Sequence, residues 1–172
     1  MPEIIFDNCV LSNFAMSDLP TGQAGSLNII KALYANKACI TDFASAENLR
    51  GILKGYKGLI RIRDAVRDGW LKEITLKGKK EKALFESLSV SLGFGEASSI
   101  AVAKTRGFIF ACDDKAARRE AGLLGVELTG TIGILVKAVR RNIIDLKQAD
   151  EILNHMANYG FYSPVSSIKK AL

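Results

Sequence analysis

The sequence lacks the features that mark several other classes of protein. Among its 172 residues no apolar run reaches the roughly 18 residues of a membrane-spanning helix, which excludes an integral membrane protein. The N-terminus has no basic segment followed by an apolar core, so no secretory signal is expected. The chain has one histidine, which argues against a Ser-His-Asp triad. We therefore expect a cytoplasmic protein without a membrane partner.

Cysteines are few and widely spaced. Cys9, Cys39 and Cys112 form no C-x-x-C motif, and each lies in or beside an apolar stretch. This pattern favours reduced thiols that act as small hydrophobic side chains. Because 48% of the residues are apolar, the chain is too hydrophobic to be intrinsically disordered and long enough to bury a core without disulfides or structural zinc.

Positive charge is concentrated in one segment. Residues 50–82 hold eleven of the 24 Lys and Arg residues but four of the 18 acids, a local charge of +7, whereas the other residues together carry −1. A charge of this kind attracts the phosphates of nucleic acids. A solvated helical face with a lysine-rich loop is the alternative interpretation.

Apolar periodicity alternates between strand and helix. Apolar runs predict strands at 3–6, 38–41, 70–76, 108–112 and 126–128. Helical spacing predicts helices from about residue 10, at 26–35, from Ser45 as the N-cap to about 53, at 59–67, from about 77 to 93, and at 95–106, 114–124, 131–140, 146–158 and 163–172. This order predicts an α/β fold, a three-layer α/β/α sandwich with a mainly parallel central sheet. We expect one domain over 1–172, with the C-terminal helices (about 146–172) packed on it or extending it.

Acidic residues follow two of the predicted strands. Asp7 ends the first, and Asp113 and Asp114 end the strand at 108–112. Parallel sheets bind ligands beyond the carboxyl ends of their strands, although an aspartate there can equally cap the next helix. Glu96 lies in the first turn of a helix, on the flank of its apolar face. Glu47 is predicted to face solvent, because the same angular count places it opposite Leu49, Ile52 and Leu53 in its helix.

Three or four of these carboxylates can form a site only if cations offset their repulsion. Two like charges about 5 Å apart repel by roughly 3 kcal/mol at an effective dielectric constant of about 20. An all-oxygen donor set suits Mg²⁺ or Mn²⁺ better than zinc. Such ions activate water and stabilise charge on a phosphodiester. An acidic pocket beside a basic segment is therefore typical of nucleases.

Several segments carry a family resemblance that runs nearly end to end. They are Asp7-x-x-Val10-Leu11-Ser12-Asn13, Gly93-Phe94-Gly95-Glu96-Ala97-x-x-Ile100-Ala101-x-Ala103, Asp113-Asp114-x-x-Ala117-Arg118-x-x-Ala121, Gly130-Thr131-Ile132-Gly133-Ile134-Leu135 and Asn158-Tyr159-Gly160-Phe161-Tyr162-Ser163. In this order they resemble the PIN-domain superfamily, in particular a prokaryotic subgroup related to the toxin ribonucleases of VapBC-type toxin–antitoxin pairs.

The resemblance implies a metal-dependent endoribonuclease in which four segments each supply one acid. By position, the catalytic acids are Asp7, Glu47, Glu96 and Asp114, with Asp113 as a further metal ligand or the alternative fourth acid; Asp42 competes with Glu47 for the second place. Ser12 matches a hydroxyl near the metal-bound water, and Asn13 supports it. Pro20–Gln23 is expected to form a loop near the site. The cofactor implied is Mg²⁺ or Mn²⁺, and the partners implied are RNA, a small antitoxin protein and a second copy of the chain in a homodimer.

Two other functions stay open at this point. The first is a non-catalytic nucleic-acid-binding or assembly module that retains the fold, in which the acids are structural. The second, weaker alternative is a nucleotide phosphohydrolase. The aromatic residues Tyr159, Phe161 and Tyr162 near the C-terminus would form a dimer contact or complete the core.

Overall fold

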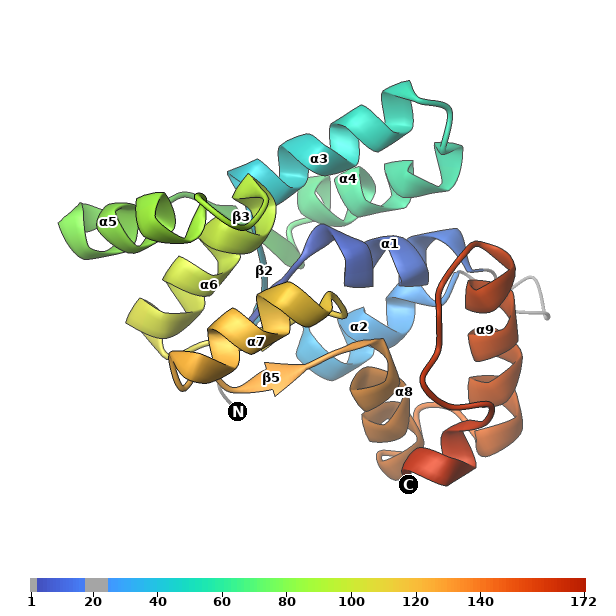
Figure 1. Cartoon of the computed structure of the whole chain (residues 1–172). Helices are drawn as coiled ribbons and strands as arrows, with labels where there is room; N and C mark the ends of the chain where they lie inside the picture. Colours follow the sequence, from blue (N-terminus) through green and yellow to red (C-terminus); the bar gives the residue numbers. More distant parts are fainter. Residues whose placement is uncertain (1–2, 18–24) are drawn as a thin grey trace.

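A five-stranded parallel sheet forms the middle layer of the protein (Figure 1). The structure is a computed structural model that describes residues 3–17 and 25–172, so the loop expected at 20–23 lies outside the described residues. The strands are β1 (Ile4–Phe6), β2 (Ala38–Thr41), β3 (Leu71–Ile74), β4 (Ile109–Ala111) and β5 (Leu128–Thr129), and they lie in the order β3-β2-β1-β4-β5. Each neighbouring pair is parallel, which confirms the predicted sheet.

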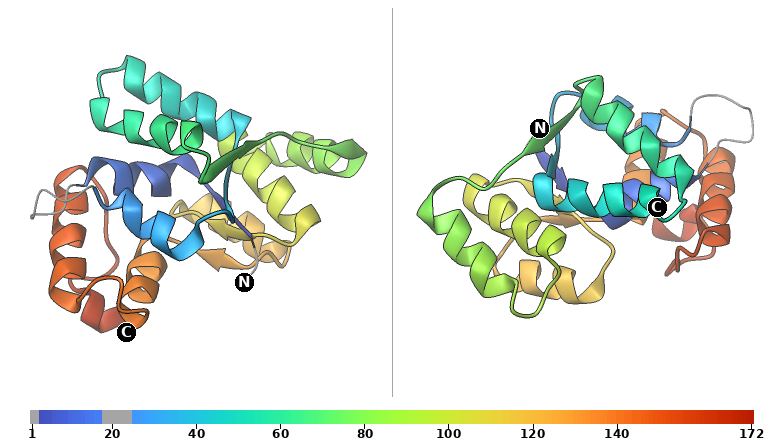
Figure 2. Two further views of the ribbon diagram at one scale, coloured as in Figure 1. Left: turned by 180° about the vertical axis from the view of Figure 1, so that it is seen from behind. Right: turned by 90° about the horizontal axis from the view of Figure 1, so that it is seen from above.

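Helices cover both faces of this sheet. They are α1 (Asn8–Met16), α2 (Leu27–Tyr34), α3 (Asp42–Leu53), α4 (Ile60–Arg67), α5 (Gly78–Leu88), α6 (Phe94–Arg106), α7 (Lys115–Leu123), α8 (Thr131–Arg140) and α9 (Leu146–Asn158), with short 3₁₀ turns η1 (Lys57–Leu59) and η2 (Ile168–Ala171). Figures 1 and 2 show α5, α6 and α7 grouped on one side of the sheet, and α1, α2, α8 and α9 on the other. The predicted three-layer α/β/α sandwich is confirmed.

The two faces of β1 bury different side chains. Ile4 and Phe6 belong to a core shared with α1, α2, α8 and α9, whereas Ile5 belongs to a second core shared with α6 and α7. All three side chains are fully buried, as expected for a central strand with helices on both sides. Each contributes about 1.5–3 kcal/mol by burial, so this strand is a rigid support for the residue that follows it.

Polar caps begin the helices at the carboxyl edge of the sheet. Asp7 caps α1 by accepting a hydrogen bond from the Cys9 amide (3.3 Å), and Asp114 caps α7 through the Ala117 amide (2.9 Å). Thr41 caps α3 through the Ala44 amide (3.1 Å), so the prediction that Ser45 begins this helix is wrong. The cause is that Thr41, although it ends a strand, has a side chain that can bind the exposed amides of the next turn.

The predicted C-terminal helix at 163–172 is also wrong. Only η2 forms there, since Pro164 disfavours helical backbone at the residue before it. Asp150 of α9 accepts hydrogen bonds from the Ile168 amide (2.6 Å) and the Ser167 hydroxyl (2.9 Å), which fixes η2 on α9. Ile168 is fully buried in the core.

None of the helices in the described ranges has the length and hydropathy required to cross a membrane.

Candidate active site

Asp7 is the most buried acid at the carboxyl edge of the sheet. It follows β1 directly, and only 4% of its surface is exposed. Its Oδ2 accepts the hydrogen bond from the Cys9 amide, but its Oδ1 has no hydrogen-bond partner in the described structure. Burial raises the pKa of the Asp7 carboxyl, and the charge of Asp114 raises it further. A buried carboxylate with one unsatisfied oxygen is costly unless a cation binds it.

Glu47 reaches the same region from α3. Its Oε1 accepts a hydrogen bond from the Gly95 amide (3.1 Å), so the prediction that it faces solvent is wrong. The angular count failed because it took Leu49 and Leu53 as the buried face of the helix, whereas they are 44% and 86% exposed. The residues that α3 buries are the small or polar Ala44, Ser45 and Asn48. Burial raises the pKa of Glu47, and the charge of Asp7 adds to this effect.

Gly95 allows Glu47 to approach α6. A Cβ atom at position 95 would lie 2.7 Å from Oε1 of Glu47, closer than any ordinary contact. The Gly-x-Gly element at 93–95 therefore serves to receive a carboxylate at the first turn of α6, where the helix dipole favours an anion.

Glu96 extends from the first turn of α6. Its Oε2 accepts a hydrogen bond from the Gly93 amide (3.3 Å), which leaves the carboxylate half-buried at the helix start. Burial, followed by the charges of Asp7, Asp114 and Glu47, raises the pKa of Glu96 to about 7. The three other acids therefore act on Glu96, although they come from three different segments of the chain.

The acid cluster, defined as Asp7, Glu47, Glu96 and Asp114, has no matching cation. No ion pair within residues 3–17 and 25–172 involves any of its members, although Arg50 lowers the pKa of Glu47 slightly. Among the described residues, no three of these carboxylates have oxygen atoms within 4.8 Å of one another. The oxygen-only donor set and the unsatisfied Oδ1 of Asp7 fit Mg²⁺ or Mn²⁺.

Asp113 has a different environment from Asp114. Its Oδ1 accepts a hydrogen bond from the Thr131 amide (2.9 Å), and its Oδ2 accepts from the Thr131 hydroxyl (2.6 Å) and the Asn13 amide group (3.1 Å). Asp113 thus fastens α1 to the start of α8. The charge of Asp113 is not among those that raise the pKa values of Asp7, Glu47 and Glu96.

Asp42, the competing second acid, lies at the start of α3. Its Oδ1 accepts a hydrogen bond from the Phe43 amide (3.0 Å). It does not contribute to the pKa shifts of the acid cluster, so the geometry favours Glu47 as the second acid.

Comparison with protein-family models gives a match over nearly the whole chain. A family model described as PIN domain (DUF3368) matches residues 3–172. The chain belongs to the PIN-domain family. PIN domains are nuclease-like domains that typically bind divalent metals. A search among curated proteins gives no match.

Two hollows of this PIN domain are lined by site residues predicted from the sequence other than the acid cluster. Ser12 and Asn13 line one of about 220 Å³, together with Met16, Leu59 and the exposed rings of Tyr56 and Tyr159. The other, of about 480 Å³, is lined by Asp113, Lys115, Arg118, Leu128, Thr129, Gly130, Ile132, Gly133, Phe161, Tyr162 and Pro164. Asn13 lines the first hollow and Asp113 the second, and a hydrogen bond connects the two residues. Ser12 makes no side-chain hydrogen bond to any described residue, and it lines the first hollow.

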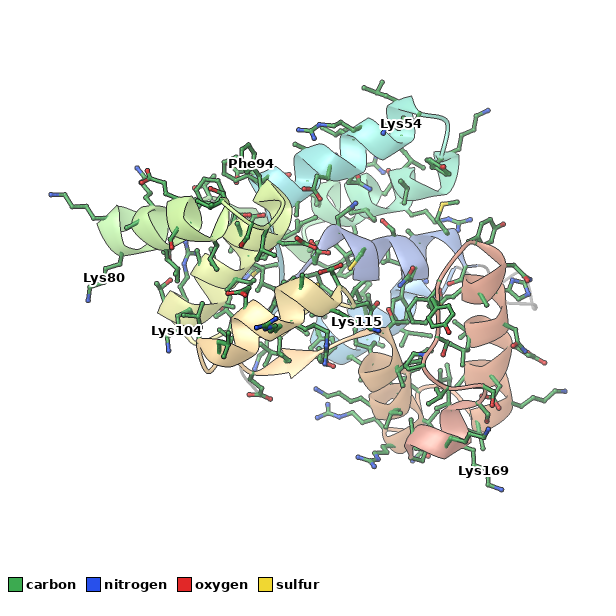
Figure 3. All side chains as sticks on the ribbon, in the orientation of Figure 1. Lys54, Lys80, Phe94, Lys104, Lys115 and Lys169 are labelled. Atoms are coloured by element: carbon green, nitrogen blue, oxygen red, sulfur yellow. The ribbon has the colours of Figure 1, made fainter. Side chains whose placement is uncertain are left out.

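The basic segment of the PIN domain does not form one patch. Figure 3 shows Lys54 at the end of α3 and Lys80 on α5, far apart in this view. Part of the charge is also neutralised internally, since Arg63 pairs with Glu73 (3.1 Å). The cations of this segment therefore lie on separate parts of the surface.

Two structural features of the PIN domain were missed from the sequence. Three phenylalanines, Phe43, Phe85 and Phe94, pack their rings together with centroids 4.8–5.9 Å apart, joining α3, α5 and α6. The partly exposed Arg106 forms an ion pair with the buried Glu81 (2.7 Å). Neither has a local sequence signal, because the partners in each set come from separate helices.

Proposed function

We propose that this PIN domain is a metal-dependent endoribonuclease that hydrolyses RNA phosphodiesters. The observation that carries the proposal is the acid cluster itself: four carboxylates from four segments lie at one sheet edge without a matching cation, and their charges raise the pKa values of Asp7, Glu47 and Glu96. Structural carboxylates are normally paired or neutralised, so this arrangement is explained by a divalent cation that completes it.

The acid cluster and its neighbours Ser12 and Asp113 have different roles in the proposed reaction. Asp7, Glu96 and Asp114, with Glu47 held by the Gly95 amide, would hold Mg²⁺ or Mn²⁺, and such an ion, when bound, lowers the pKa of water and stabilises charge on phosphate oxygens. Ser12 orients the attacking water with its hydroxyl. Asp113 is a positioning residue, because it fixes Asn13 beside Ser12 and the start of α8.

The surroundings of the site suit a nucleic acid. Lys115 begins α7 directly after Asp114 at the carboxyl edge, where it would bind a phosphate beside the scissile bond. Tyr56 and Tyr159 are 57% and 61% exposed at the hollow next to Ser12, and exposed rings of this kind stack on unpaired bases. These features favour an RNA strand over a small nucleotide.

A toxin role, silenced by a small antitoxin in the cytoplasm, forms the biological part of the proposal. Leu49 and Leu53 of α3, Tyr56 and Ile60 give the molecule an exposed apolar face. A surface of this kind is typical of protein contacts. An antitoxin or the second subunit of a homodimer would cover it, and the mass of the natively purified protein distinguishes the two.

One observation supports a non-catalytic binding module as the second candidate. Asp7 and Asp114 cap helices, and Glu96 completes a capping arrangement at α6. In that case the acids are structural, and the basic segment alone binds nucleic acid.

The deciding experiment is cleavage of a mixed-structure RNA panel with Mn²⁺ or Mg²⁺ by wild type and Glu96→Gln, after denaturing purification to remove any bound antitoxin. A metal-dependent cut that Glu96→Gln loses supports the nuclease. Cutting retained in the variant points to a contaminant or a misplaced site. No cutting, with salt-sensitive RNA binding by both proteins, supports the binding module.

A further inference from the structure

Two cysteine thiols lie against Asp7. Cys9 is in the first turn of α1, and Cys112 follows β4, which pairs with β1 so that Phe6 is opposite Ala111. The two Sγ atoms and a carboxylate oxygen of Asp7 all lie within 4.8 Å of one another. Cys112 donates a long hydrogen bond through its Sγ to Oδ2 of Asp7 (3.9 Å), and Cys112 and Asp7 are both buried.

All three cysteines pack in the apolar cores, as small hydrophobic residues do: Cys39 and Cys112 lie in one core, and Cys9 packs against both cores. The thiols of Cys9 and Cys112 also lie against a buried carboxylate, whereas Cys39 belongs to no group of metal-binding side chains in the described structure. The proposed hydrolysis makes no use of either thiol.

The donor atoms indicate what would bind them. Two sulfurs and one carboxylate oxygen form a donor set that Zn²⁺ and other thiophilic cations accept and that Mg²⁺ does not favour. Two sulfur ligands of a tetrahedral zinc ion lie about 3.8 Å apart, given Zn–S bonds of about 2.3 Å. Since the three donor atoms already lie within 4.8 Å of one another, small side-chain adjustments suffice to close around an ion.

We propose that Asp7, Cys9 and Cys112 form a second cation site, specific for thiophilic divalent ions such as Zn²⁺ and Cd²⁺. On binding, each thiol gives its proton to solvent, and the ion forms two metal–sulfur bonds and one bond to the carboxylate, with water completing the coordination. Oδ2 of Asp7 faces Cys112, while Oδ1 has no partner, so one carboxylate is shared between this site and the acid cluster. Zn²⁺ therefore competes with Mn²⁺ for Asp7. This last consequence rests on the proposed function, whereas the site itself does not.

The test titrates the reduced, metal-free protein with Cd²⁺ and records the ultraviolet thiolate-to-metal charge-transfer band without RNA. Wild type and Cys39→Ala, the matched control, are expected to give the same saturable band. Cys9→Ala and Cys112→Ala each lose about half of its amplitude and at least tenfold in affinity, since even outer-shell changes cost 10–100-fold. The proposal is overturned if wild type gives no band, or if Cys9→Ala titrates like Cys39→Ala. Because Cys112 is fully buried, Cys9→Ala decides should Cys112→Ala fail to fold.

A second readout separates this proposal from the nuclease. Zn²⁺ is added to Mn²⁺-supported cleavage, and inhibition is expressed relative to each protein's own rate without Zn²⁺. Cys9→Ala is expected to need at least tenfold more Zn²⁺ than Cys39→Ala. A cysteine-dependent band without any RNA cleavage overturns the nuclease and keeps the site, whereas metal-dependent cleavage without a band overturns the site and keeps the nuclease.

Discussion

Replacing Glu96 by glutamine removes one charge from the acid cluster while keeping the size of the side chain. The glutamine Oε1 can still accept the hydrogen bond from the Gly93 amide. In the protein without metal, the variant therefore isolates the electrostatic cost of the carboxylate from its role at the start of α6.

The size of this cost follows from the pKa. The pKa of Glu96 rises from 4.5 to about 7, mainly through burial and then through the charges of Asp7 and Asp114. At 1.36 kcal/mol per pKa unit this shift corresponds to roughly 3 kcal/mol, which we reduce to about 1–2 kcal/mol because Glu96 is partly exposed and screened by solvent. Because its pKa is higher in the folded protein, the protonated Glu96 carboxyl stabilises the fold relative to the ionised one. This contribution is fully present below about pH 4.5 and is lost as the pH rises through 7.

Urea unfolding in a chelating buffer at pH 5 and pH 8 measures the effect. Between these values, wild type is expected to lose about 1–2 kcal/mol more stability than Glu96→Gln. Glu86→Gln, which changes an exposed glutamate of α5, serves as the control and is expected to follow wild type. Equal pH dependence in wild type and Glu96→Gln would refute the view that burial and the neighbouring acids raise the pKa of Glu96.

Three further substitutions test other parts of the account. Gly95→Ala places a Cβ atom 2.7 Å from Oε1 of Glu47, so Mn²⁺ affinity is expected to fall at least tenfold with little loss of stability, and unchanged affinity in a titration contradicts the role of Gly95. Tyr56→Ala is expected to weaken binding of single-stranded RNA by about 1–3 kcal/mol in fluorescence anisotropy, and equal affinity argues against stacking. Arg106→Met leaves Glu81 buried without its partner, so urea unfolding should show a loss of about 3 kcal/mol, and a loss below about 1 kcal/mol shows that the pair is unimportant.

The fold and two of the acids were predictable because their signals are local. Asp7 directly follows β1 and Asp114 comes three residues after the end of β4, and parallel pairing places both at one edge of the sheet. The position of Glu47 was not predictable from periodicity, because α3 exposes Leu49 and Leu53 and buries polar residues instead.

The remaining differences depend on contacts between distant segments. Asp113 and Asp114 are adjacent in sequence, and hydrogen bonds from the distant Asn13 and Thr131 to Asp113 distinguish their environments. The two thiols at Asp7 belong to residues 103 positions apart and meet through the register of β1 with β4. No pattern in a single segment reports either arrangement.

The central claim is that the acid cluster holds a divalent cation, and Mn²⁺ titration of the metal-free protein by calorimetry tests it most directly. The account predicts saturable binding by wild type and Asp42→Asn, with affinity reduced at least about tenfold in Glu96→Gln. The claim is contradicted if wild type shows no saturable binding, or if Glu96→Gln binds Mn²⁺ as tightly as wild type does.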